Sequence, residues 1–193
     1  MRISFIRQIK DSHFLSLGIE GEGESFRFTV SASAYASLGR PAVGEELSEH
    51  VLAELSFADE LYRAEKKALS LLSYADNNEK NLCMKLQRAG FSREVARTVC
   101  ERMVSLGYVD ERRQLERLVL RAANEALLSP RRITEKLCAK GYSRSLVTEV
   151  IRELEAAGDV DFDDSRRRLI MKLPEDASED DVKKLLFKYG YKQ

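Results

Sequence analysis

Two evenly spaced series of basic residues in the middle of the chain are the residues best suited to binding chemistry. Within each series the residues recur at intervals of four, and the two series are Arg113, Arg117 and Arg121, then Arg132, Lys136 and Lys140. Residues four apart lie on the same face of a helix, so each series predicts a basic stripe along one helix. Such stripes can bind phosphate groups or an acidic protein surface.

Apolar residues opposite each stripe predict that the two helices pack against a core. They are Leu115, Leu118, Val119, Ala122 and Ala126 in the first segment, and Ile133 and Leu137 in the second. The alternative is an ordinary solvated face, because Glu116, Glu125 and Glu135 can pair with the cations within each helix. A second basic cluster, Arg166–Arg168, lies beside four aspartates, which predicts local ion pairing or helix-end electrostatics rather than a binding site.

Residue types that carry catalysis or bind metals are sparse and scattered. The histidines are His13 and His50, and the cysteines are Cys83, Cys100 and Cys138. Their spacing fits no zinc site, and nothing in the sequence places a cysteine beside a histidine. The chain has no glycine-rich phosphate loop, and the acidic run 159–164 lacks the glycine and terminal glutamate of an EF-hand loop. We therefore expect no enzymatic activity, no cofactor and no bound metal.

The composition predicts a folded protein with no overall bias towards one class of charged partner. Of 193 residues 44% are hydrophobic, which is enough for a core, while Lys+Arg and Asp+Glu balance at 32 each. Any electrostatic function therefore depends on how the charges are distributed. Since the chain has neither a signal-peptide pattern nor a long apolar segment, and its three cysteines suit a reducing compartment, we expect a cytoplasmic protein that does not enter a membrane. We also expect it to be a monomer.

The first 57 residues predict a small β-rich segment. Apolar and polar residues nearly alternate over 2–9 and 26–30, and a further apolar stretch covers 14–19, so we expect three strands. A glycine-rich turn at 20–24 joins the second and third strands into a meander. A short helix is expected near Ser33–Leu38, closed by Gly39.

From about Leu47 onward the apolar residues recur at helical intervals of three and four. Each run is short and begins or ends at a glycine or a serine. We therefore expect helices of roughly ten to fifteen residues, none of them long enough to form a coiled coil.

The strongest feature of the sequence is an internal repeat. The segment Lys85–Ser92 reappears as Lys136–Ser143, an offset of 51 that holds without a gap over 82–110. A third copy begins 49 residues after the second, so that Gly141 is matched by Gly190. A match that runs through capping residues, glycines and apolar positions is improbable among unrelated amphipathic helices.

Helix-capping residues recur at fixed places in each copy. The N-cap residues of the first helices are Asn78, Ser129 and Ser178, those of the second helices are Ser92 and Ser143, and the glycines after the first helices are Gly90, Gly141 and Gly190. The aromatic residues that follow these glycines are Phe91, Tyr142 and Tyr191. Because all three copies need the same turn, we expect these rings to pack on their helices rather than stack on nucleic-acid bases.

These tandem three-helix units resemble the RecX family of recombination regulators. The resemblance rests on a leucine placed four residues before a glycine–aromatic pair, as in Leu86–Phe91, and on the ending Gly107–Asp110, and it covers residues 64–191. The lead-in 44–74 is also similar to that family. Where the family carries an arginine and a serine before the first helix, this chain has Asn77 and Asn78, which keep the capping chemistry but not the arginine.

The resemblance implies a regulatory protein of DNA repair, recombination and the SOS response that binds the RecA filament on single-stranded DNA and inhibits strand exchange. The six residues of the basic stripes are then the candidate partner-binding residues, with weak direct DNA binding as a further expectation. One alternative is a DNA-binding protein whose three-helix units contact phosphates or grooves without RecA. Another is an adaptor whose stripes bind acidic protein. Binding along the filament groove and capping of filament ends both stay open.

The expected fold is mainly α-helical, with tandem three-helix repeats in an extended array after the β-rich segment. The expected boundaries are 1–57 for that segment, 58–110 and 111–161 for two complete repeats, and 162–193 for an incomplete third repeat.

Overall fold

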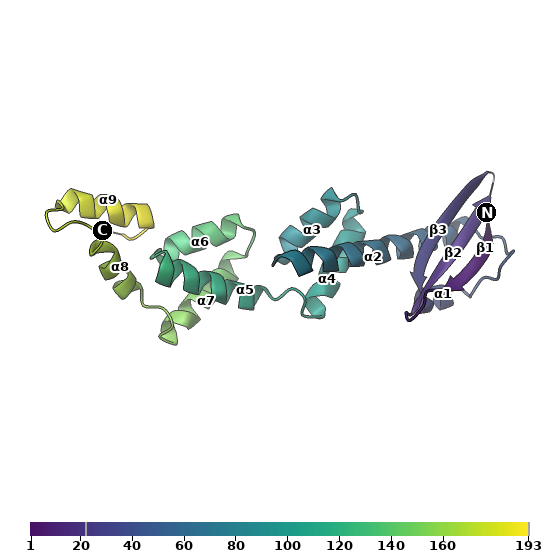
Figure 1. The fold of residues 1–193 in the computed structure, drawn as a ribbon, viewed down its shortest axis with the longest axis horizontal. Helices are drawn as coiled ribbons and strands as arrows, with labels where there is room; N and C mark the ends of the chain where they lie inside the picture. Colours follow the sequence, from purple (N-terminus) through teal and green to yellow (C-terminus); the bar gives the residue numbers. More distant parts are fainter. Residues whose placement is uncertain (22, 193) are drawn as a thin grey trace. The chain divides into compact units, whose positions relative to one another are not determined.

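The protein is described by a computed structural model that covers residues 1–21 and 23–192. The chain folds into two compact units. The first unit comprises Met1–Asn77 and Leu82–Leu106, and the second comprises Asn78–Asn81 and Gly107–Gln193. Most of the described chain is helical, with one small sheet at the N-terminus (Figure 1).

The sheet of the first unit is the predicted three-stranded meander. Strands β1 (Arg2–Gln8), β2 (Phe14–Gly21) and β3 (Glu24–Ser31) pair antiparallel in the order β1-β2-β3. One residue of the predicted turn at 20–24, Glu22, lies outside the described residues. The buried face of the sheet carries Leu17, Ile19 and Val30, and this face packs against Tyr35 and Leu55 from the helices that follow.

Two helices follow the sheet, and the second corrects the expected helix length. The short helix α1 (Ala32–Ser37) confirms the prediction for Ser33–Leu38. Helix α2 (Glu49–Tyr74) is 26 residues long, so the expectation of ten to fifteen residues is wrong there. The physical reason is that no glycine or proline interrupts 49–74, and one face of α2 packs first on β3 and then on α4.

A buried carboxylate joins α2 to the sheet. The Thr29 backbone N–H donates to Asp59 Oδ1 over 2.7 Å, and Arg63 Nε donates to Asp59 Oδ2 over 2.8 Å. A buried charge is tolerated only when it is paired and hydrogen-bonded, and Asp59 has both kinds of partner. Within residues 1–21 and 23–192, no helix combines the length and the apolar character needed to cross a bilayer.

Helices α3 (Glu79–Arg88) and α4 (Arg93–Ser105) complete the first unit, although the first residues of α3 belong to the second unit. Helix α4 lies against α2. The N-terminus of α4 is held by Glu60 of α2, whose Oε1 accepts the Ser92 N–H over 2.6 Å. The Val95 N–H donates to Ser92 Oγ, which confirms the predicted N-cap.

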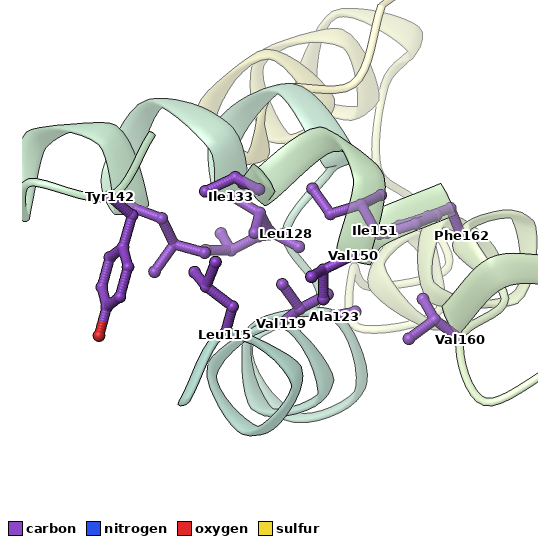
Figure 2. Packing of buried hydrophobic residues seen from close by; sticks show 12 residues of the cluster. Leu115, Val119, Ala123, Leu128, Ile133, Tyr142, Val150, Ile151, Val160 and Phe162 are labelled. Atoms are coloured by element: carbon purple, nitrogen blue, oxygen red, sulfur yellow. The ribbon is translucent and has the colours of Figure 1, made fainter. Parts of the chain in front are cut away.

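The second unit is helical throughout. Its elements are α5 (Glu111–Leu120), the π-helical turn η1 (Arg121–Glu125), α6 (Pro130–Ala139), α7 (Arg144–Ala156), α8 (Phe162–Ile170) and α9 (Glu179–Tyr189). Figure 2 shows side chains from α5, α6 and α7 pointing into one apolar cluster, among them Leu115, Ile133 and Val150. The Tyr142 ring lies at one edge of this cluster, where its hydroxyl donates to Gln114 Oε1 over 2.9 Å.

The π-helical turn changes which residues face the core after Leu120. The Ala126 N–H bonds to the Arg121 carbonyl five residues earlier, so this turn holds one more residue than an α-helical turn. Leu115, Val119 and Ala123 are buried, and Leu118 and Ala122 are half-buried. The prediction that Ala126 faces inward is wrong: Ala126 is exposed, and the next buried residues after Ala123 are Leu127 and Leu128, because the wider turn inserts one extra residue.

The predicted caps and glycines of the repeats are confirmed. Gly90, Gly141 and Gly190 have φ values of +95°, +99° and +86°, the left-handed region that favours glycine. Ser129 Oγ accepts the Arg132 N–H, and Ser178 and Asp181 form a capping box. In that box, hydrogen bonds from Ser178 lower the pKa of the Asp181 carboxyl.

Two helix junctions in the second unit have the same form. The C-terminal end of α6 lies against the residues that begin α3, and the C-terminal end of α9 lies against the residues that begin α6. The Lys140 carbonyl at the end of α6 accepts hydrogen bonds from the Asn78 and Asn81 side chains, over 2.9 Å and 3.0 Å. At the equivalent place one repeat later, the Ser129 N–H donates to the Tyr189 carbonyl over 3.1 Å. The junction thus recurs with the sequence repeat.

The ring of Tyr191 packs beside this second junction. It contacts the apolar cluster of Leu127, Leu169 and Leu186, as predicted for the aromatic residue after the glycine. Burial raises the pKa of Tyr191 to about 12. The last residue of the predicted third repeat, Gln193, lies outside the described residues.

The junction predicts that Gly190→Ala destabilises the protein more than Gly158→Ala. Both glycines have positive φ, and a left-handed alanine costs about 1–2 kcal/mol at either place. At Gly190 an added Cβ would also lie 2.5 Å from Ser129 Oγ and 2.8 Å from Arg132 Cβ, whereas at Gly158 it would meet nothing within 4 Å. Urea unfolding should give a further loss of about 1 kcal/mol or more for Gly190→Ala. Equal losses would contradict a tight junction.

Candidate partner-binding surface

Capped helix starts orient the two basic stripes. Asp110 Oδ1 accepts the Arg113 N–H over 3.0 Å at the start of α5, and Ser129 caps α6 with Pro130 in its first turn. The caps fix where each helix begins, and the burial of Leu115, Ile133 and Leu137 then turns the stripes outward. The six predicted residues, Arg113, Arg117, Arg121, Arg132, Lys136 and Lys140, are all exposed.

A groove between the α5–η1 segment and α6 brings three of these residues together. Arg121, Lys136 and Lys140 line a hollow of about 740 Å³. Its apolar lining is made by Leu118, Ala122, Ala126, Leu128, Ile133, Leu137 and Ala139. Glu125 is the one acidic residue among the lining residues that the structure describes. The groove therefore combines an aliphatic floor with a positive rim.

The other three predicted residues do not line this groove. Arg113 and Arg117 precede Arg121 along α5, two helical turns and one turn away respectively. Arg132, in the first turn of α6, instead lines a separate hollow together with Arg131. The two stripes therefore do not form one continuous basic patch. Only their C-terminal residues, Arg121 from the first and Lys136 and Lys140 from the second, line the same groove.

Ion pairs within the helices engage part of the stripes, as the solvated-face interpretation predicts. Arg121 Nε lies 3.3 Å from Glu125 Oε2, and Arg132 Nη1 lies 3.2 Å from Glu135 Oε2. The Arg121–Glu125 pair is more than two thirds exposed on both sides, so it contributes little stability and can exchange for a partner's carboxylate. Such pairs do not remove the positive charge of the groove, because three cations face one carboxylate there.

One arginine outside the predicted set has a structural role. Arg112 of α5 bonds to Glu149 over 3.2 Å and to Glu153, both on α7. These hydrogen bonds, the one to Glu153 first, raise the pKa of the Arg112 guanidinium. Sequence reasoning missed this contact because residues 37 and 41 positions apart are joined only by the packing of α5 on α7.

Four other arginines, on α4 and α8, pair with nearby carboxylates. Arg167 and Arg168 lie 3.8 Å and 3.9 Å from the Asp164 carboxylate, which confirms the predicted pairing in α8. On α4, Arg97 pairs with Glu101 over 3.6 Å and Arg102 with Glu65 over 2.6 Å. Helix α4 therefore directs at least two of its arginines to the protein's own carboxylates, which is unlike a DNA-recognition helix.

Groups suited to catalysis or metal binding remain apart. Within residues 1–21 and 23–192, no three His, Cys, Asp or Glu side chains gather as metal ligands. Both histidines lie in the first unit, outside its buried core. Cys100 is buried, as its apolar place in the repeat predicts, while Cys83 and Cys138 are half-buried. The exposed groove between α5–η1 and α6 is suited to binding by charge and apolar contact.

Proteins with similar sequences are regulatory proteins of one family. The chain is 31% identical over 143 residues to "Regulatory protein RecX" of Clostridioides difficile (strain 630), which covers 74% of this chain and 65% of that relative. It is 30% identical over 122 residues to the protein of the same name from Pseudomonas fluorescens (strain SBW25), which covers 63% of this chain and 78% of that relative. No protein-family model matches the sequence.

The relatives differ in how much of their length the chain spans. It spans 65% of the relative from Clostridioides difficile, and 60% and 56% of those from Trichlorobacter lovleyi and Oceanobacillus iheyensis. A crystal structure of regulatory protein RecX matches with a TM-score of 0.75 at 22% identity, over 99% of this chain and 94% of that chain. The fold prediction, mainly helical after a small β-rich segment, is thereby confirmed.

The Arg131–Glu135–Arg132 cluster predicts a pH-dependent contribution to stability. Hydrogen bonds from Arg131 and then Arg132 lower the pKa of Glu135 below its ordinary 4.5. This contribution is fully present above pH 4.5 and is lost as the pH falls through the lowered folded-state pKa. Glu135→Gln should therefore reduce the free energy of unfolding at neutral pH, with a difference that narrows in acid. Urea unfolding over a pH series measures it, and a difference independent of pH would contradict the assignment.

Proposed function

Because the chain belongs to the RecX family of regulatory proteins, we propose that it binds the RecA filament on single-stranded DNA and inhibits recombinase activity. The family gives the regulatory role, and RecA is the partner that the resemblance of the repeats implies. The groove between α5–η1 and α6 is the proposed contact surface.

One observation carries this proposal: the groove joins a positive rim to an aliphatic floor. Arg121, Lys136 and Lys140 can pair with carboxylates of a protein partner, and the accessible parts of Leu118 and Ala139 can bury its apolar side chains. Protein–protein contacts combine an apolar centre with a polar rim in this way. A surface that binds only the phosphates of DNA needs the cations but gains little from an aliphatic floor.

The proposal is tested on preformed RecA filaments. Stoichiometric amounts of this protein should lower the ATPase rate and the strand-exchange rate of the filaments. The alternative of a DNA-binding protein that works without RecA predicts tight binding to naked duplex and no such inhibition. That result would overturn the proposal.

Reversing the charge of the groove should weaken filament binding. The variant Arg121→Glu with Lys136→Glu and Lys140→Glu repels the carboxylates that the rim is proposed to bind, so we expect at least about a tenfold loss of affinity, equal to about 1.4 kcal/mol. The control is Arg166→Glu with Arg167→Glu and Arg168→Glu on α8, which makes the same change of net charge away from the groove. Co-sedimentation with filaments measures both variants, with helical circular dichroism as the check on folding. Equal losses in the two variants would show that only net charge matters.

Filling the groove tests the apolar half of the proposal. Ala139 lines the groove and is not part of the buried core, so Ala139→Trp adds a ring to the floor without disturbing the core. The ring should displace a partner's apolar side chain and lower filament affinity by about tenfold with no change of charge. The matched control is Ala156→Trp, at an exposed position of α7 outside the groove. Unchanged binding by Ala139→Trp would show that the apolar floor of the groove does not contact the filament.

A further inference from the structure

A second hollow, between the start of α6 and the end of α9, has a different chemistry from the groove. Its volume is about 510 Å³, within the range of about 300–1,000 Å³ typical of small-ligand sites. Its lining residues are Arg131, Arg132, Glu135, Phe187, Lys188, Gly190, Tyr191 and Lys192. Four cations and one carboxylate thus line the hollow together with two aromatic side chains, Phe187 and the half-buried Tyr191. We call this the α6–α9 hollow.

The exposure of Phe187 is not explained by the packing of the repeat. Its ring is 79% exposed, although it belongs to the helix whose Leu186 is buried. The internal repeat places Cys138 and Gln87 at the positions equivalent to Phe187. A small or polar residue therefore satisfies the fold at this position, and the phenylalanine adds an exposed aromatic face that the core does not use.

The two arginines at the start of α6 are likewise not required by the helix. The N-terminus of a helix carries partial positive charge, so cations in its first turn are unfavourable. The equivalent turn of α9 follows this rule with Glu179, Asp180 and Asp181, while the first turn of α6 carries no acidic residue. Glu135 pairs with both Arg131 and Arg132, at 2.9 Å and 3.2 Å, and holds the two guanidinium groups beside the hollow.

The two walls of the hollow are fixed to each other. The Ser129 N–H donates to the Tyr189 carbonyl, and Gly190 lies so close to Ser129 and Arg132 that a Cβ would collide with them. The cations of α6 are therefore held at a set place relative to the ring and lysines of α9. A ligand that contacts both the α6 cations and the α9 ring therefore binds groups that are already in place, which lowers the entropic cost of binding.

We propose that the α6–α9 hollow binds single-stranded nucleic acid. A base stacks on Phe187, and the neighbouring phosphates bind Arg131, Arg132, Lys188 and Lys192. An exposed ring among cations is the arrangement by which proteins bind single strands without reading sequence. A duplex keeps its bases stacked on each other, so they cannot stack on Phe187. An acidic peptide would pair with the cations but would gain less from an exposed aromatic ring than an unpaired base does. This inference does not depend on RecA.

The test uses the absence of tryptophan from the natural sequence. In Phe187→Trp the indole becomes the one tryptophan of the chain and keeps the stacking surface. An oligodeoxythymidylate of about 15 nucleotides should bind and quench its fluorescence. The matched control is Met171→Trp, because Met171 is also 79% exposed and does not line the hollow. The oligonucleotide should leave the fluorescence of that variant nearly unchanged.

Two further measurements, both without RecA, separate stacking from simple attraction of a polyanion. An abasic strand of the same length should not quench the Phe187→Trp fluorescence. Phe187→Ala should lower oligonucleotide affinity by about tenfold, and Arg131→Gln with Arg132→Gln should lower it and flatten its salt dependence. Equal quenching at positions 187 and 171, equal quenching by the abasic strand, or quenching by polyglutamate instead of the oligonucleotide would overturn the proposal. Because RecA is absent from these measurements, their failure would not contradict the proposed binding to RecA filaments, which is tested separately.

Discussion

The left-handed glycine after the first helix of each repeat is the constraint on which the second unit depends. It ends the helix, and because it has no Cβ it lets the start of another helix lie directly against that end. Gly141 lies against Asn78 in this way and Gly190 against Ser129. Each contact also satisfies backbone groups that a helix end leaves unpaired, since Lys140 and Tyr189 provide carbonyls to the facing N-terminal turn.

This geometry explains why the two candidate surfaces differ. The α6–α9 hollow lies at a junction, where the end of one helix and the start of another bring Lys188 beside Arg132. The groove lies along the flank of α6, where the π-helical turn η1 changes the register of the preceding helix and leaves Ala126 in the lining. Aliphatic side chains line the groove and an aromatic ring lies in the hollow, so the two surfaces suit different ligands.

A chain with no net charge can carry such surfaces because its charges are sorted by location. Arg112 and Arg102 each pair with a carboxylate of a neighbouring helix, and Arg168 pairs with a carboxylate of its own helix. Arg121, Lys136 and Lys140 lie instead around a concave surface with one acid among the described lining residues. The electrostatic character of this protein is therefore a property of its surfaces and not of its composition.

The sequence alone determined the features that depend on local rules. The meander, the caps, the glycine turns and the repeat follow from periodicity and from the conformations that Ser, Asn and Gly adopt, which act over a few residues. The six stripe residues were also predicted to be exposed from the helical period alone. Tertiary structure decided what depends on distant contacts: the packing of α2 on β3 and α4, the exposure of Ala126, and the placing of Lys140 and Arg121 around one groove. It also placed Phe187 beside Arg131, 56 positions earlier in the chain, because only packing brings such residues together.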